Sequence, residues 1–174
     1  NTAYTQSEVD YFIEDASPKI FVGQSLRDDV KAFTMNALGQ GSFVEQLNSY
    51  PADSESPIVQ CYSNDLAAIL YTSGTTGRSK GAMLSHGNLA SNANSLADFW
   101  GWQKSDVLLH ALPIFHVHGL FIASHCALLN ATPIIFLPKF DAAQALALLS
   151  EATVLMGVPT FYTRLLQQPN LNRN

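Results

Sequence analysis

The chain has 174 residues, of which 47% are hydrophobic and 13% are charged, and its formal net charge is −5. This composition is typical of a folded protein with a sizeable core and excludes a disordered chain, while the negative charge argues against a nucleic-acid partner. No apolar run reaches the roughly 18 residues of a membrane span, no signal peptide opens the chain, and Cys61 and Cys126 are too few for a disulfide framework, which favours a reducing, cytoplasmic location.

The charge is unevenly distributed along the chain. Residues 1–60 carry nine acidic side chains against three Lys or Arg, a net charge of −6, whereas residues 61–174 carry five against six, a net charge of +1. An anionic ligand is therefore expected to bind the second part. The chain begins at Asn1 rather than Met, so we expect it to be a piece of a longer protein.

The first 60 residues predict two helices and one strand. Ser7 is expected to cap a helix that ends before Pro18 and carries its apolar side chains on one face: Val9, Phe12, Ile13 and Ala16. Residues 20–22 form a short apolar run that predicts a strand. A second helix is predicted from the spacing of Leu26, Val30 and Phe33. Most of residues 39–57, rich in Gly, Pro, Ser and acidic side chains, is predicted to be a surface loop.

The rest of the chain alternates regularly between strands and helices. Strands are predicted at residues 66–71, 82–84, 107–112, 133–137 and 154–156. Helices are predicted at residues 89–100 and about 119–129, after a capping pair formed by Asp141 and Gln144, and after Pro159. Such alternation predicts an α/β fold with a mostly parallel sheet flanked by helices.

Residues 71–81, Tyr-Thr-Ser-Gly-Thr-Thr-Gly-Arg-Ser-Lys-Gly, follow the strand at 66–71 and are rich in groups that bind phosphate. Glycines let backbone N–H groups approach an anion, the hydroxyl groups add donors, and Lys80 supplies a positive charge. The order differs from a Walker loop, because Ser79 precedes Lys80. A cluster of Gly, Ser and Thr is also often only a flexible connector, and composition alone does not separate the two.

Residues 110–119, His-Ala-Leu-Pro-Ile-Phe-His-Val-His-Gly, form a second candidate site. The pair His116 and His118, with His125 and Cys126 nearby, suggests a zinc site, but no carboxylate or Cys-x-x-Cys spacing completes it. Histidines of this kind more often form hydrogen bonds in a core or a pocket. No metal site is predicted.

The whole string at 71–81 resembles the signature loop of the adenylate-forming superfamily, which includes the acyl-CoA synthetases and luciferases. The resemblance implies that a mobile loop binds the β- and γ-phosphates of ATP, with Mg²⁺, through Thr72, Ser73, Gly74, Thr75, Thr76, Gly77, Arg78, Ser79 and Lys80. Many relatives have Pro in place of Ser79, a difference that frees the backbone there. The string at 110–119 resembles the superfamily's aromatic motif, which implies that His116, with Phe115 and His118, lines the acid pocket. No residue of this segment is implied to be catalytic.

Residues 137–141 and 153–166 resemble malonyl-CoA synthetases in particular. The resemblance implies that a carboxylate, here malonate, attacks ATP to give an acyl-adenylate and that CoA then forms the thioester. Residues 1–174 are then part of the large N-terminal domain. The remainder of that chain, with the C-terminal domain and its catalytic Lys, is absent, so the segment alone is expected to be inactive. A fatty-acyl or other acyl-CoA ligase, or a non-catalytic nucleotide-binding domain, are the alternatives.

Overall fold

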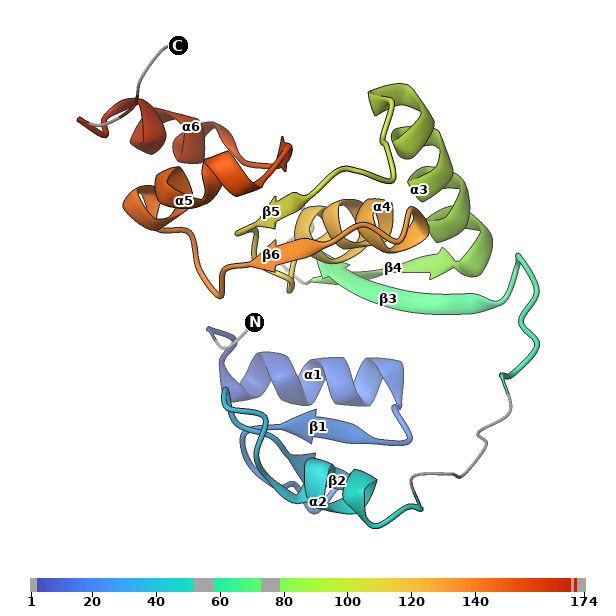
Figure 1. Ribbon diagram of the computed structural model, residues 1–174. Helices are drawn as coiled ribbons and strands as arrows, with labels where there is room; N and C mark the ends of the chain where they lie inside the picture. Colours follow the sequence, from blue (N-terminus) through green and yellow to red (C-terminus); the bar gives the residue numbers. More distant parts are fainter. Residues whose placement is uncertain (1–2, 52–57, 73–78, 170, 172–174) are drawn as a thin grey trace. The chain divides into compact units, whose positions relative to one another are not determined.

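A computed structural model describes residues 3–51, 58–72, 79–169 and 171 (Figure 1). The chain forms two compact units, Asn1–Gln60 and Cys61–Asn174. This boundary coincides with the change of charge along the sequence, so the first unit carries the excess of acidic side chains and the second is close to neutral.

The first unit opens with helix α1 (Gln6–Ala16), which Thr5 caps. The Thr5 side chain accepts a hydrogen bond from the Glu8 N–H, and the Glu8 carboxylate accepts one from the Thr5 N–H at 2.7 Å. The prediction that Ser7 caps this helix is wrong, because the reciprocal arrangement needs Glu or Gln three residues after the cap, and only Thr5 has it. The helix ends as predicted before Pro18, at Ser17 in the left-handed conformation (φ 45°).

Strands β1 (Phe21–Gly23) and β2 (Ala32–Thr34) form a parallel two-stranded sheet. The strand predicted at 20–22 is confirmed with a shift of one residue. The helix predicted from Leu26, Val30 and Phe33 is wrong, because Phe33 lies in β2 opposite Val22. The segment between the strands is instead held by polar contacts of Arg27, described next.

The Arg27 guanidinium donates to both Asp29 carboxylate oxygens, at 2.8 and 2.6 Å, and forms an ion pair of 2.7 Å with Asp10 of α1. These contacts join helix α1 to the segment between β1 and β2. Residues 24–31 form no helix, so the helical spacing of the apolar residues there is coincidental.

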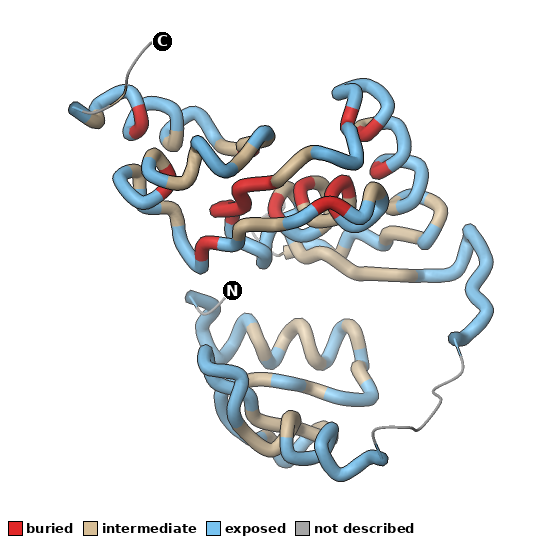
Figure 2. Tube along the Cα trace, viewed as in Figure 1, coloured by how far each residue is buried: buried red, intermediate tan, exposed pale blue. Residues whose placement is uncertain are grey.

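Helix α2 (Ser42–Asn48) lies within residues 39–57, so the prediction of a loop there is wrong for this stretch. The helix has only seven residues and starts at Gly41 (φ 136°) without a side-chain cap, which left little periodicity to detect. It packs through Phe43, whose ring lies 6.1 Å from that of Phe33. Residues 52–57 lie outside the described part of the chain. None of the described residues of the first unit is fully buried (Figure 2).

The second unit begins with an antiparallel hairpin of β3 (Leu66–Thr72) and β4 (Lys80–Ser85). Both strands are confirmed, and β4 is longer than predicted. Helix α3 (His86–Trp100) follows directly, capped by Ser85, whose side chain accepts from the Asn88 N–H at 3.1 Å. Gly101, with φ of 64°, ends this helix.

A three-stranded parallel sheet completes the second unit, in the order β6–β5–β7. Its strands are β5 (Leu108–His110), β6 (Ile134–Phe136) and β7 (Val154–Leu155). The connections contain the π-helix η1 (His118–Ala123), α4 (Ser124–Leu129), α5 (Ala142–Leu148) and the 3₁₀ turn η2 (Leu149–Glu151), and α6 (Pro159–Leu166) follows β7. Asp141 caps α5 through the Gln144 N–H, at 2.8 Å, and Pro159 opens α6, both as predicted. Three of the four strand pairings within the described residues are parallel, which confirms the predicted α/β fold.

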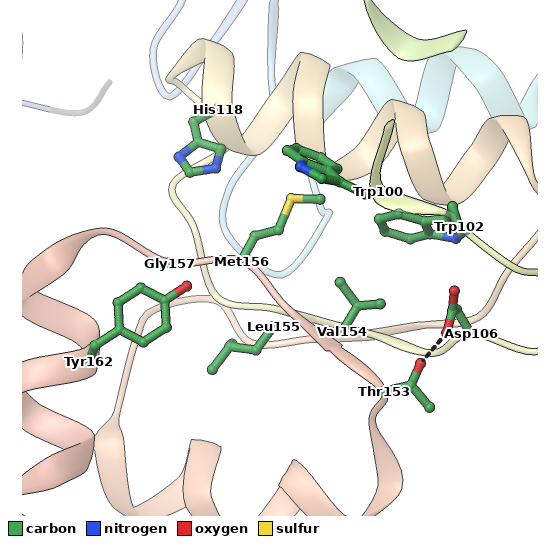
Figure 3. Close-up of a pocket in the computed structure, with 10 residues that line it drawn as sticks. All are labelled: Trp100, Trp102, Asp106, His118, Thr153, Val154, Leu155, Met156, Gly157 and Tyr162. Atoms are coloured by element: carbon green, nitrogen blue, oxygen red, sulfur yellow. Dashed lines mark hydrogen bonds between the residues drawn. The ribbon is translucent and has the colours of Figure 1, made fainter. Parts of the chain in front are cut away.

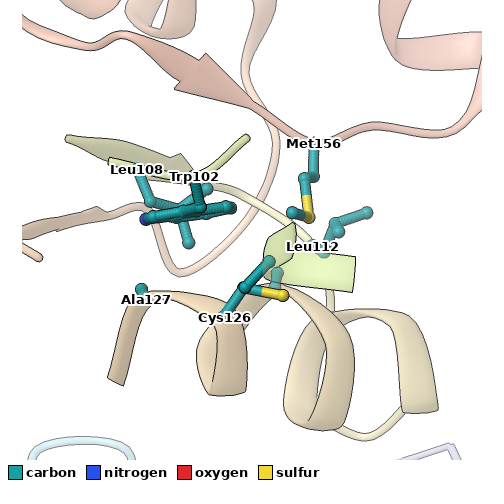
Figure 4. Close-up of a cluster of buried hydrophobic side chains, with 8 residues drawn as sticks. Trp102, Leu108, Leu112, Cys126, Ala127 and Met156 are labelled. Carbon is teal, nitrogen blue, oxygen red and sulfur yellow. The ribbon is translucent and has the colours of Figure 1, made fainter. Parts of the chain in front are cut away.

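The central strand β5 is buried on both faces, and its alternate side chains enter two separate cores. Leu108, fully buried, packs into a cluster with residues of α3, η1 and α4 (Figure 4): Ala97, Trp102, Leu112, Ala123, Cys126, Ala127 and Met156. Leu109, also fully buried, packs into a second cluster with Ala145 of α5 and Leu165 of α6. Helices therefore cover both faces of the sheet, as its continuous apolar sequence requires.

Candidate functional site

The predicted phosphate loop connects the two strands of the hairpin. Thr72, the last residue of β3, pairs in register with Lys80, the first residue of β4. Ser73, Gly74, Thr75, Thr76, Gly77 and Arg78 lie outside the described residues. Thr72 and Lys80, which precede and follow this segment and Ser79, are thus held at paired positions of one antiparallel ladder. The loop lies between two antiparallel strands, and the next helix, α3, begins only after β4.

Lys80 is exposed, as is Thr72 across the ladder, and Ser79 is half-buried. The ion pairs within the described part of the chain involve Arg27 and not Lys80. The next residue, Gly81, lies against β3 so closely that a Cβ atom there would be 2.7 Å from the Ile69 side chain. The backbone at the exit of the loop is thus packed, while the ammonium group of Lys80 stays available to an anion.

The second predicted site is a tight turn after β5. The His116 N–H donates to the Pro113 carbonyl at 3.2 Å, and the Leu120 N–H donates to the His116 carbonyl at 2.9 Å. Phe115 and His116 are exposed, and their rings lie 4.6 Å apart. His118 is half-buried and begins the π-helix η1. The turn follows the carboxyl end of a central parallel strand, where α/β proteins commonly bind ligands.

A cavity of about 440 Å³ lies along β7, within the second unit (Figure 3). This volume is within the usual range of small-molecule pockets. Of the three predicted pocket residues, His118 lines the cavity, whereas Phe115 and His116 are not among its lining residues. The other lining residues come from the end of α3, the loop before β5, β7 and α6: Trp100, Trp102, Asp106, Thr153, Val154, Leu155, Met156, Gly157 and Tyr162.

Sequence reasoning missed these other lining residues. Those that follow β7, Met156 and Gly157, had one detectable signal: two neighbouring parallel strands end at the same edge of a sheet, so the turn after β5 and the turn after β7 must lie together. Figure 3 shows the Met156 side chain extending toward His118 and Trp100, with Tyr162 on the other side of the cavity. Trp100 and Trp102 carry no comparable signal.

Polar contacts hold the end of the cavity that lies beside the first residues of β5 and β7. The Asp106 carboxylate accepts a hydrogen bond of 2.7 Å from the Gln103 N–H and another of 2.7 Å from the Thr153 hydroxyl. These two donors hold the pKa of Asp106 below its usual value. The Trp102 indole N–H donates to the Thr132 hydroxyl at 3.2 Å, which fixes the ring. The walls between these groups are largely apolar.

The described residues contain no group of three His, Cys, Asp or Glu side chains placed to hold a metal ion. This finding covers His116, His118, His125 and Cys126, the residues of the zinc alternative. In the described segments, no helix is both long and apolar enough to cross a membrane.

The AMP-binding enzyme family model matches residues 1–174. The chain belongs to the AMP-binding enzyme family. Among solved structures, the ATP-bound MatB from Rhodopseudomonas palustris is similar with a TM-score of 0.88 and 52% identity, over 97% of this chain and 35% of that protein.

Two curated AMP-binding relatives show the range of named substrates. The mitochondrial malonate–CoA ligase ACSF3 of Mus musculus is 38% identical over 94% of this chain and 30% of its own length. The long-chain-fatty-acid–CoA ligase FadD13 of Mycobacterium tuberculosis (strain ATCC 25618 / H37Rv) is 33% identical over 97% of this chain and 35% of its own length. This chain therefore spans about a third of the length of these relatives.

Proposed function

We propose that this chain is a segment of an ATP-dependent acid-CoA ligase that activates a carboxylate, malonate, as an acyl-adenylate and then forms its CoA thioester. The observation that carries this proposal is the exposed Lys80 without an ion-pair partner among the described residues, at the exit of a Gly- and hydroxyl-rich loop whose ends pair in β3 and β4. The similarity to ATP-bound MatB supports the same assignment of the loop.

The residues of the loop suit this chemistry. A carboxylic acid with a pKa of about 4 is ionised at neutral pH, so its attack on the α-phosphorus of ATP needs no general base. The protein must instead align two anions and neutralise charge on the phosphates. Thr72, Ser79 and Lys80, with the six loop residues outside the described part, provide the donors and cations for this task. ATP supplies the adenylyl group, Mg²⁺ adds positive charge at the phosphates when bound, and CoA is the acyl acceptor.

The acid is proposed to bind beside the turn after β5. His118 lines the cavity along β7, and Phe115 and His116, which do not line that cavity, are proposed to contact the acid from the exposed turn that carries His118. Malonate is proposed from the similarity to the mouse malonate–CoA ligase and to MatB.

A fatty acid is the second candidate, favoured by the apolar side chains Trp100, Met156 and Leu155 along the cavity and by the similarity to FadD13. Acid-dependent pyrophosphate exchange by the full-length protein separates the two acids. Exchange with a fatty acid but not with malonate would exclude malonate.

The loop is tested by Lys80→Ala in the full-length protein. Because hydrogen bonds to charged groups contribute roughly 1.5–3 kcal/mol, we expect ATP to bind about 10- to 100-fold more weakly. Lys104→Ala, which removes an exposed Lys outside the loop, is the matched control and should bind ATP as the wild type does. Unaltered ATP affinity and unaltered turnover in Lys80→Ala would refute the phosphate role.

We further propose that the 174 residues alone do not complete the reaction, because they span about a third of the relatives' length. Acid-dependent pyrophosphate release by the purified segment would contradict this. ATP binding by a full-length protein that forms no adenylate with any acid would instead favour a non-catalytic nucleotide-binding domain. A cytoplasmic location is proposed from the low cysteine content of the chain, and the mitochondrial name of the mouse relative makes cell fractionation the necessary test.

A further inference from the structure

His110 is a buried histidine to which neither the sequence analysis nor the proposed reaction assigns a task. It is the last residue of the central strand β5 and is 1% exposed. Its Nε2 atom lies 2.9 Å from the Gly119 carbonyl oxygen and 3.2 Å from the Ser124 hydroxyl oxygen. The Ser124 hydroxyl also donates to the Gly119 carbonyl, at 2.9 Å. Two side chains from different elements thus hold one carbonyl group.

The geometry fixes the tautomer of His110. A carbonyl oxygen only accepts hydrogen bonds, so Nε2 must carry the proton that it shares with Gly119. The other ring nitrogen, Nδ1, is buried without a hydrogen-bond partner among the described residues. An apolar side chain of similar size would avoid this unfavourable burial, but it would leave the Gly119 carbonyl without its donor.

Gly119 is also the point at which the turn after β5 closes. A Cβ atom on Gly119 would lie 2.4 Å from the Pro113 carbonyl oxygen, so the two backbones are in direct contact. The Pro113 carbonyl in turn accepts the His116 N–H, and His118 directly precedes Gly119. A shift of Gly119 must therefore move Pro113, His116 and His118 together.

We propose that His110 is a positioning residue, whose Nε2–H holds the Gly119 carbonyl and thereby sets the position of His116 and His118 at the acid pocket. The proposal rests on the proposed function of that turn as a wall of the pocket. The hydrogen bonds of the His110 ring go to Gly119 of η1 and Ser124 of α4, so the proposal predicts an effect on acid binding rather than on ATP binding.

The test compares His110→Leu with His110→Gln in the full-length enzyme, since the Gln amide can place an N–H near the position of Nε2. We expect His110→Leu to raise KM for the acid about tenfold, the loss of one buried hydrogen bond, with KM for ATP within about twofold of wild type. His110→Gln should restore most of the acid KM. A purely structural role would instead lower the melting temperature and the active fraction and leave both KM values unchanged.

Ser124→Ala keeps the test decisive if His110→Leu does not fold. It removes the second donor to Gly119 and should raise KM for the acid about two- to fivefold, again without affecting KM for ATP. The matched control is Ser91→Ala, which removes an exposed serine that donates to the Asn88 carbonyl at 3.2 Å and should change neither constant. An unchanged acid KM in Ser124→Ala, or His110→Gln no better than His110→Leu, overturns the proposal. A wild-type enzyme that activates no acid would instead refute the proposed function, and the positioning role would be refuted with it.

Discussion

Gly119→Ala should destabilise the second unit, although alanine is the better helix former. Gly119 lies in the π-helix without an unusual φ, so helix propensity alone predicts a gain of about 1 kcal/mol. The added Cβ would however lie 2.4 Å from the Pro113 carbonyl oxygen, where ordinary contacts begin at 3.4 Å. Backbone atoms must move by about 1 Å beside fully buried Ala123 and nearly buried Leu112. Overpacking of this kind costs about 3 kcal/mol. This cost exceeds the gain from helix propensity, so we expect Gly119→Ala to lower the free energy of unfolding.

Urea unfolding followed by tryptophan fluorescence measures this difference. The chain has two tryptophans, and Trp102 packs in the same core cluster as Ala123 and Leu112. Gly101→Ala is the comparison, because Gly101 has φ of 64° and open space around its Cβ position, so only backbone strain of about 1 kcal/mol applies. A free energy of unfolding for Gly119→Ala equal to or above that of the wild type would refute the close approach to Pro113.

Two further predictions concern ionisable groups of the second unit. Asp106→Asn should lower the urea midpoint at pH 7, because the depressed pKa of Asp106 means that its charged form stabilises the fold. That contribution is present above the unfolded value of 3.8 and is lost as the pH falls through the lower folded pKa, so the two midpoints should converge once the pH is below that folded pKa. A difference independent of pH would contradict this prediction. A thiol reagent such as DTNB should label exposed Cys61 quickly and Cys126 only after unfolding. The reason is that Cys126 is fully buried and burial raises the pKa of its thiol. Equal labelling rates of the two cysteines in the folded protein would contradict this prediction.

The elements of the second unit were predictable because their signals are local. The strand at 66–71 is an apolar run with turn residues after it, and the last helix starts at Pro159 as a proline at the first turn favours. The first unit was harder to predict. Phe33 belongs to a strand whose partner lies eleven residues earlier, and no local pattern distinguishes it from the third position of a helical stripe.

Some residues of the candidate site were also predictable from local sequence, whereas others were not. The proposed phosphate loop could be recognised because its composition is unusual, and the strands on either side of it end at Thr72 and begin at Lys80. His118 was found from its motif, but Trp102, Asp106 and Thr153 line the cavity only because β5 and β7 pair through residues 46 positions apart. Their contribution depends on tertiary contacts that a single sequence does not display.

The bond between the Asp106 carboxylate and the Thr153 hydroxyl joins residues 47 positions apart. Strand β5 is the middle strand of its sheet, yet both of its neighbours are synthesised after it. During synthesis on the ribosome, both edges of the strand that carries Leu108 and Leu109 therefore stay unpaired until β6, α5 and finally Thr153 have emerged. A nascent chain that pauses after β5 but before Thr153 would expose an unpaired, apolar strand. We expect chaperones to bind the chain at this stage of synthesis.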